Sequence, residues 1–468
     1  MKKNQNTQIL GVIVGNREYF PDQLAEEGGK IVIKTLRNLG FDVVTSFSEE
    51  TGSGSVQTRE DSQECARVFK EHADEIDGVL VTLPNFGDEK GVAETLRLSN
   101  LDVPVLVHAF PDDITLMDRI HRRDSFCGKF SVCNNLYQYG IKFTNTQKHV
   151  EAPDSKEFKE DLILFADVCN TVKKLKNCRL GAVGVRPNAF KTVRYSEKIL
   201  ERNGIALENV SLVEIIGRAQ ELNDSDQVVK VVNQMEDLFN CTDIPQEAIK
   251  KTASLITALN EWIKENDLDT LSISCWPAIE KYYGIVPCSA MSFISQSLIP
   301  SACETDVMGS LSMYALQCAS NKPAALVDLN NNYTDDKCVL FHCSAFARDF
   351  FEKKPELTCH EMQGYYGSLS GSMTPGPVTL FALSTDDNEG KIKAYTAEGR
   401  ITEDEIKTFG SYGVMEVEKL ESLLHFIVKK GFPHHVAIVR DHVADVLEEA
   451  VGNYLEWEIY RHNPSMIV

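Results

Sequence analysis

Short apolar runs alternate with amphipathic stretches in the first third of the chain. The runs with the length and composition of strands are QILGVIVG, DVVTSF, GVLVTLP and VPVLVHA. The stretches with apolar residues at helical spacing are LAEEGGKIVIKTLRNLG and REDSQECARVFKEHADEI. Such alternation is typical of a parallel α/β layer. It predicts a Rossmann-like domain over residues 1–155, which ends in the polar, proline-containing segment KHVEAPDSKE.

The same alternation returns after an amphipathic helix that begins near Glu157. Its strand-like runs are CRLGAVGV and LDTLSISCW, and they predict a second Rossmann-like α/β domain over residues 156–348. Beyond about residue 350 the sequence is rich in loops and contains the runs VTLFAL, KIKAYTAEGRI and HHVAIVRDHV. This pattern is typical of antiparallel strands, and it predicts a smaller β-rich C-terminal domain with a closing helix over residues 349–468.

The stretch from Leu298 to Asn332 predicts a strand, a helix and a second strand, with a carboxylate at the end of each strand. The first apolar run ends before Glu304, and the second ends at Asp328. Because the carboxyl ends of parallel strands meet at one edge of an open sheet, we expect both acids to face the same opening. Neighbouring carboxylates repel unless a cation or a shared proton compensates, so the pair indicates a divalent metal or an acid/base pair. The alternative is that each acid caps a helix or closes an Asx turn.

Aromatic and imidazole side chains at other strand ends add candidates. Trp276 ends the strand SISC, where its ring can stack on a sugar or fill the core. His434 and His435 follow a Gly-Phe-Pro turn and precede the strand VAIV, which indicates either a metal ligand or a solvated pair. His342 and His360 are further candidate ligands.

The charge and the cysteines narrow the classes of partner. A net charge of −21, from 48 basic and 69 acidic residues, argues against a nucleic-acid or anionic-membrane surface and favours a small molecule or a metal ion. The 13 cysteines form no CxxC pair and lie mostly in apolar runs, as reduced thiols of a cytoplasmic protein do. A dinucleotide fingerprint of the form GxGxxG is absent. No stretch approaches the ~20 apolar residues of a membrane span.

Three segments resemble the L-fucose isomerase and L-arabinose isomerase superfamily of aldose–ketose isomerases. They are ACETDVMGSLSMYAL, AALVDLNNNY and FPHHVAIVRDHVADVL. The resemblance implies that Glu304, Asp328 and His435 hold a divalent Mn²⁺, and that the two acids are also the catalytic proton-transfer pair. Asp328 resembles the fucose branch, since the arabinose branch has a glutamate there and adds a histidine ligand.

The resemblance also implies substrate contacts and an assembly. His434 matches a position that lines the sugar site, Arg17 in GNREYFP matches an arginine that reaches the substrate, and Phe86 falls near a family tryptophan. Members of this family form homo-oligomers, trimers or hexamers, in which the N-terminal domain can complete the site of a neighbouring subunit. The alternative for Arg17 is a surface ion pair with Glu18 or Asp22.

The predicted function is therefore a metal-dependent aldose–ketose isomerase that acts on a pentose or a 6-deoxyhexose, such as L-fucose, D-arabinose or L-arabinose. Reaction through an enediol needs a base at C2, an acid at C1 and a cation at the two substrate oxygens. One alternative is a non-catalytic sugar-binding protein with a crevice between two lobes, and another is a metal-dependent hydrolase or aldolase. A set of Glu, Asp and His contributed by two domains favours the enzyme over the passive binder.

Overall fold

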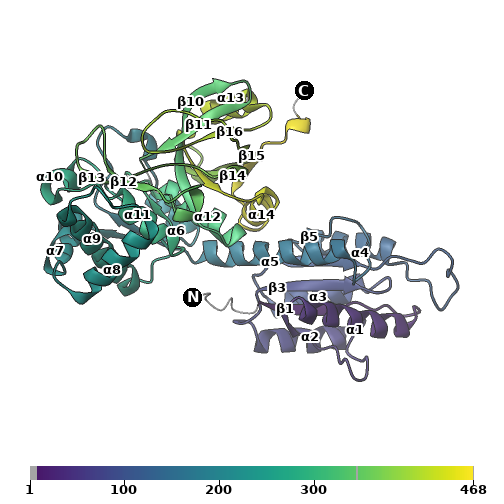
Figure 1. Ribbon diagram of the computed structural model, residues 1–468. Coiled ribbons are helices and arrows are strands. Elements are labelled where there is room, and N and C mark those ends of the chain that lie inside the picture. Colours follow the sequence, from purple (N-terminus) through teal and green to yellow (C-terminus); the bar gives the residue numbers. More distant parts are fainter. Residues whose placement is uncertain (1–7, 344–345, 467–468) are drawn as a thin grey trace. The chain divides into compact units, whose positions relative to one another are not determined.

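The computed structural model describes residues 8–343 and 346–466. The chain divides into two compact units (Figure 1). Unit 1 consists of Met1–Lys173 with Asn453–Leu455, and unit 2 consists of Lys174–Gly452 with Glu456–Val468. Among the described residues, no helix is both long enough and apolar enough to cross a membrane.

Unit 1 is a parallel α/β layer. Its 5-stranded sheet has the order β2-β1-β3-β4-β5, and every pairing in it is parallel. The strands are β1 (Ile9–Val14), β2 (Asp42–Val44), β3 (Gly78–Leu83), β4 (Val105–Ala109) and β5 (Thr144–Asn145). The helices are α1 (Asp22–Asn38), α2 (Arg59–Glu71), α3 (Glu89–Ser99), α4 (Ser125–Gln138) and α5 (Lys156–Lys176).

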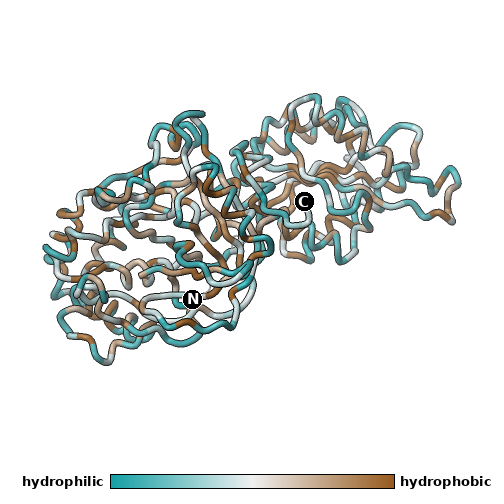
Figure 2. The backbone as a smooth tube through the Cα atoms, turned by 90° about the horizontal axis from the view of Figure 1, so that it is seen from above, coloured by the Kyte–Doolittle hydropathy of each residue, from teal (hydrophilic) through white to brown (hydrophobic). Residues whose placement is uncertain are grey.

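Strand β1 shows why the strands of unit 1 are continuous apolar runs in the sequence. Leu10, Val12 and Val14 belong to one hydrophobic core and Ile13 belongs to another, so alternate side chains enter cores on the two faces of the sheet. Helices cover both faces, and a strand buried on both sides needs no polar alternation. Hydrophobic residues accordingly gather along the interior strands in Figure 2.

Unit 2 begins with a second, smaller parallel layer. Its 4-stranded sheet has the order β7-β6-β8-β9. The strands are β6 (Arg179–Val183), β7 (Ala206–Val210), β8 (Thr270–Ile273) and β9 (Ser301–Ala302). The helices are α6 (Glu197–Arg202), α7 (Leu212–Glu221), α8 (Asp226–Leu238), α9 (Gln246–Glu265), α10 (Ala278–Tyr283), α11 (Cys288–Gln296) and α12 (Val307–Ser320).

The rest of unit 2 is a mixed 9-stranded sheet with the order β12-β13-β16-β11-β10-β17-β14-β15-β18. Its strands are β10 (Ala324–Thr334), β11 (Lys337–His342), β12 (Glu356–Cys359), β13 (Tyr366–Ser372), β14 (Gly376–Asp386), β15 (Lys391–Ile401), β16 (Ser411–Glu416), β17 (His435–Val439) and β18 (Glu458–Arg461). Helices α13 (Leu420–Lys430) and α14 (Ala444–Leu447) accompany it. The predicted fold class, two Rossmann-like α/β layers followed by a β-rich region, is confirmed.

The strands next to the two predicted acids differ from the expectation. Both were expected in one parallel sheet, but β9 belongs to the 4-stranded sheet, whereas β10 lies in the 9-stranded sheet between antiparallel partners. Strand β10 also continues beyond Asp328 to Thr334, where its polar residues pair with β11. An apolar run of four or five residues does not reveal the direction of its partner strands, and the expectation of a shared parallel sheet was therefore wrong.

Candidate metal and catalytic site

Glu304 lies in the tight connection between β9 and α12. Glu304 and Thr305 have φ values of 61° and 52°, so two consecutive residues other than glycine adopt the left-handed conformation. Such a backbone costs about 1–3 kcal/mol per residue and persists only where the surrounding structure enforces it. The cap of α12 is Asp306, whose Oδ1 accepts a hydrogen bond from Gly309 N at 2.9 Å. The carboxylate of Glu304 is therefore not the helix cap, and its side chain is almost completely buried.

The pairing of β10 with β17 brings Asp328 to His435. The two residues are directly opposite each other in the antiparallel register, so their side chains project from the same face. The distance from His435 Nε2 to Asp328 Oδ1 is 3.3 Å, and the distance from the same nitrogen to Glu304 Oε2 is 3.2 Å. Three residues that are far apart in the sequence thus converge on one point.

Asp306 fixes the orientation of His435, and the sequence reasoning missed it as a site residue. Its Oδ2 lies 2.7 Å from His435 Nδ1. A carboxylate can only accept a hydrogen bond, so Nδ1 carries the proton and donates it, which leaves the lone pair of Nε2 facing Glu304 and Asp328. The available signal was an aspartate two residues after Glu304 at the start of a helix, which a cap alone explains.

The electrostatics of this site favour a positive charge at its centre. Glu304 Oε2 and Asp328 Oδ1 are buried and accept no hydrogen bond from any described residue. Burial opposes a charged imidazole at His435, but the neighbouring carboxylates of Asp306 and Glu304 outweigh it and raise the pKa of His435 well above its usual value. The positive charge can be the imidazolium proton or a divalent cation. With the cation bound, Nε2 of His435 loses its proton and its lone pair becomes a third donor beside the two carboxylate oxygens.

His342 at the end of β11 adds a fourth group. It forms a group with Glu304 and His435, in which one ligand atom of each residue lies within 4.8 Å of the others. The ring centroids of His342 and His435 are 5.8 Å apart. His360, the other additional candidate, belongs to none of the groups of potential metal ligands found among the described residues. His342 is thus available as a further ligand, and His360 is not.

His434 borders the same site. Its Nε2 is 3.6 Å from Asp328 Oδ1, and its ring lies edge-on to His435 with a centroid distance of 4.6 Å. The side chain is 45% exposed, whereas that of His435 is 2% exposed. Partial burial, followed by the charge of His435, lowers the pKa of His434. A neutral, half-exposed imidazole at the rim suits contact with a substrate better than structural burial.

Phe190 connects Trp276 to the histidines, and no sequence signal pointed to it. Its ring is edge-on to Trp276 at 5.5 Å between centroids, and 6.2 and 6.4 Å from the rings of His434 and His435. Trp276 is partly buried against the core of unit 2. The ring therefore packs on the core, as one alternative for Trp276 had it, and it also belongs to an aromatic wall beside the site. Stacking of this ring on a sugar stays a prediction.

Arg17 and Phe86 lie together in unit 1. The guanidinium Cζ of Arg17 is 4.4 Å from the centroid of the Phe86 ring, and Nη1 is 2.6 Å from Glu89 Oε2. The ion pair of Arg17 is thus with Glu89, and not with Glu18 or Asp22 as the surface alternative had it. Asp22 instead accepts a hydrogen bond from the side chain of Asn16 at 2.7 Å.

Comparison with known proteins gives matches at both ends of the chain. Residues 11–176 match the family described as fucose/sulfoquinovose isomerase, N-terminal domain, and residues 340–462 match L-fucose isomerase, C-terminal domain. The sulfoquinovose isomerase of Priestia aryabhattai is 24% identical over 459 residues, which are 97% of this chain and 99% of that protein. That of Alkalicoccus urumqiensis is 24% identical over 324 residues, 68% of this chain and 70% of the relative.

These matches define the chain as an isomerase of sugars. It belongs to the L-fucose isomerase-like family, as the resemblance of its segments implied. His342, His434 and His435 lie within the matched C-terminal region, whereas Glu304 and Asp328 fall between the two matched regions. The assignment of those two acids therefore depends on the geometry described above.

Proposed function

We propose that the chain is a metal-dependent aldose–ketose isomerase that acts through an enediol. The observation that carries this proposal is the convergence of Glu304 Oε2 and Asp328 Oδ1 on His435 Nε2, at 3.2 and 3.3 Å. We assign these three residues as ligands of a divalent cation, preferably Mn²⁺, because this ion accepts mixed carboxylate and imidazole donors. When bound, the ion supplies Lewis-acid stabilisation of the charge on the enediolate oxygens.

Glu304 and Asp328 are also the proposed catalytic pair. Isomerisation requires one group to take the proton from C2 of the aldose and another to deliver a proton to C1. Two carboxylates beside one imidazole can divide these tasks, one taking the proton from C2 and the other passing a proton to C1. Burial of Glu304 keeps bulk water away from the proton during the transfer.

The aromatic wall is the proposed binding surface for the sugar. Trp276 and Phe190 offer ring faces and edges to the apolar side of a sugar, and His434 offers a hydrogen-bonding group at the rim. We also propose that Arg17 and Phe86 bind the substrate and that unit 1 of a neighbouring subunit supplies them. This arrangement fits a homo-oligomer, a trimer or a hexamer, of a cytoplasmic enzyme.

An exposed apolar segment in unit 1 supports assembly with further copies of the chain. Exposed large hydrophobic side chains gather in the excursion between β4 and α4 and along α4, namely Ile114, Leu116, Met117, Ile120, Phe126, Phe130, Tyr137 and Tyr139. Soluble monomers seldom display so many large apolar side chains in one short segment. The excursion is visible beside α4 in Figure 1.

For the substrate, we propose a sugar that carries an anionic group, with sulfoquinovose as the first candidate. The relatives named above are sulfoquinovose isomerases. The loop that carries Phe190 contains Arg186, Lys191 and Arg194, and none of the three forms an ion pair with an acid among the described residues. Three cations without an acidic partner, in the loop whose Phe190 contacts the histidines of the site, suit a sulfonate better than the neutral L-fucose or arabinose in a chain with a net charge of −21.

Loss of the metal and of the acids tests the reaction. Removal of divalent ions by chelation should abolish isomerisation, and Mn²⁺ should restore it.

Glu304→Gln and Asp328→Asn should each lower turnover by about 10³-fold or more, because positioned acid/base catalysis alone contributes ~10²- to 10⁴-fold. Ketose formation measured by NMR reports both effects, and circular dichroism checks the fold. Substrate binding with no turnover in any variant or metal state would instead support the non-catalytic sugar-binding protein.

A pair of sugars that differ by the sulfonate group tests the loop. Sulfoquinovose and its neutral 6-deoxy analogue should be compared in Lys191→Gln and Arg194→Gln. We expect KM for the sulfonate to rise by about tenfold or more in these variants, with little change for the neutral sugar. Lys198→Gln is the control, since Lys198 is an exposed lysine on the neighbouring helix α6. Equal effects on both sugars would contradict a role in binding the anion.

A further inference from the structure

Four cysteines gather beside the candidate metal site, although they come from four different elements. Cys275 follows β8, Cys288 begins α11, Cys303 follows β9 and Cys343 follows β11. The first three are buried, Cys343 is partly buried, and all four are free thiols. The mechanism proposed above uses none of them.

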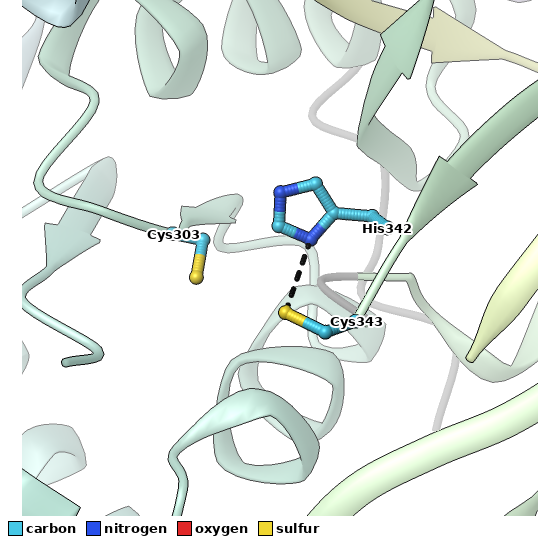
Figure 3. Close-up of side chains that lie close together, drawn as sticks. All are labelled: Cys303, His342 and Cys343. Carbon is cyan, nitrogen blue, oxygen red and sulfur yellow. Dashed lines mark hydrogen bonds between the residues drawn. The ribbon is translucent and has the colours of Figure 1, made fainter. Parts of the chain in front are cut away.

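The donor atoms of this cluster are arranged around Cys343. Its Sγ is 3.7 Å from His342 Nδ1 and 3.7 Å from Cys288 Sγ. Donor atoms of Cys303, His342 and Cys343 all lie within 4.8 Å of one another, and Figure 3 shows the three side chains directed toward a common space. For comparison, the edge of a tetrahedral site with Zn–S bonds of ~2.3 Å is about 3.8 Å.

The chemistry of these donors differs from that of the carboxylate site next to it. Thiolate sulfur is a soft ligand that selects Zn²⁺, Cd²⁺ or Cu⁺, whereas carboxylate oxygen suits Mn²⁺ and Mg²⁺. His342 is close to both sets, since it also lies within 4.8 Å of ligand atoms of Glu304 and His435. A thiophilic ion and a hard ion would therefore bind to different groups in this region.

We propose that Cys303, His342 and Cys343 form a second metal site, selective for a thiophilic cation of the Zn²⁺ class, with Cys288 close enough to approach as a further donor. Binding displaces the thiol protons and engages the imidazole of His342. Its ligands include neither of the proposed catalytic carboxylates, and His342 is the one group that it shares with the surroundings of the carboxylate site.

The test is a titration of the full-length protein with Cd²⁺, under reducing conditions and with excess Mg²⁺ to occupy the carboxylate site. Cadmium–thiolate bonds absorb in the near ultraviolet, so the readout does not depend on enzymatic activity. We expect about one equivalent of Cd²⁺ to bind with this absorption, and Zn²⁺ to compete for it. Cys303→Ser and Cys343→Ser should each lower the affinity at least tenfold.

Two sets of controls distinguish this site from others. Cys127→Ser and Cys359→Ser remove exposed thiols that do not belong to the cluster and should leave the titration unchanged. Glu304→Gln should also retain the thiolate absorption. Absence of the band in the wild-type protein, or a titration that is unchanged in both Cys303→Ser and Cys343→Ser, would overturn the proposal. Loss of the band in Glu304→Gln, with the fold intact, would do so too, because the ion would then belong to the carboxylate site.

Discussion

Asp306 shows how one side chain can support both a helix and a proposed metal ligand. One carboxylate oxygen caps α12 through Gly309 N, and the other holds the Nδ1 proton of His435 at 2.7 Å. Outer groups of this kind set the tautomer and the direction of a ligating histidine. The two functions use different oxygens, so a substitution can separate them.

Asp306→Asn should weaken Mn²⁺ binding by about 10- to 100-fold while preserving the helix. The asparagine oxygen can still cap α12, since asparagine is as good a cap as aspartate. Its amide group then faces His435 and donates, which moves the ring proton to Nε2, the atom required for the metal. Calorimetric titration with Mn²⁺ measures the change. The control is Asp88→Asn, which alters a cap on α3 with the same geometry and no histidine.

We predict that the buried side chain of His108 makes the stability of unit 1 depend on pH. Complete burial lowers its pKa from 6.5 to about 3. The carbonyl of Glu151 accepts from Nε2–H, and Nδ1 is paired with the hydroxyl of Thr82, so the neutral ring is satisfied. The unfolded chain binds a proton near pH 6.5 and the folded chain does not, so the stability is present above that pH and decreases below it.

Between pH 7.5 and 5, this histidine should cost the folded state about 2 kcal/mol. Urea unfolding of the wild type and of His108→Gln at both pH values checks the prediction, because groups common to the two proteins cancel in the difference. The advantage of the wild type over the variant should shrink by that amount at pH 5. An advantage that does not change with pH would mean that His108 is protonated in the folded chain.

At the scale of single residues, sequence reasoning identified the acids and the histidine that converge, but not the groups that hold them. Glu304, Asp328 and His435 stood out because charged or imidazole groups directly follow or begin apolar runs. Phe190 lies in a loop with no periodicity, and Asp306 satisfied a simpler explanation as a helix cap. Their roles depend on contacts with residues more than 80 positions away, which local patterns do not encode.

At the scale of elements, the site depends on the junction of two sheets. Helix α12 follows β9 of the parallel sheet and packs against β10 and β17 of the mixed sheet. The helix predicted between the two acids is present as α12, in which apolar residues recur at helical spacing and are buried, namely Val307, Leu311, Tyr314 and Cys318. It could not predict that β10 has antiparallel neighbours, because a run buried on both faces has no alternation to read.

Gly309 in the first turn of α12 tests this junction. A Cβ at this position would lie 2.5 Å from Asp306 Oδ2 and 2.9 Å from a methyl group of Leu326 on β10. Gly309→Ala should therefore destabilise unit 2 by about 1–3 kcal/mol and weaken Mn²⁺ binding, although alanine is the better helix former.

The control is Gly217→Ala in the middle of α7, where a Cβ would meet nothing within 4 Å. That substitution should raise stability by ~0.5–1 kcal/mol, from helix propensity alone. Thermal unfolding and Mn²⁺ titration of the two variants give the comparison. If both alanines stabilise the protein, the contact of α12 with β10 is looser than described.

At the scale of the whole molecule, alternating patterns and composition predicted the fold class, and the −21 charge favoured a small-molecule partner. The 9-stranded sheet was harder to predict, because it pairs β10 with β17, and a pairing across more than a hundred residues has no local signature. Subunit assembly is harder still to predict, because it depends on contacts between chains that local patterns do not encode. The most specific prediction about the assembly concerns Arg17 in unit 1 and Glu304 in unit 2.

We expect Arg17 of one subunit to serve the site that contains Glu304 of another. The guanidinium is partly exposed, stacks on Phe86 and has its other donors available to sugar oxygens or a sulfonate. Arg17→Ala should lose most activity, whereas Arg37→Ala, which removes an exposed ion pair with Glu49 in the same unit, should not.

Mixing the inactive Arg17→Ala and Glu304→Gln proteins under conditions of subunit exchange decides whether the sites are shared. If each site takes the two residues from different chains, roughly a quarter of the sites in a random mixture receive both wild-type residues, and activity should return to about that fraction. If both residues come from the same chain, every site carries one defect whatever its neighbour. No recovery despite exchange, verified by mass spectrometry of tagged subunits, would place both residues in the site of one chain.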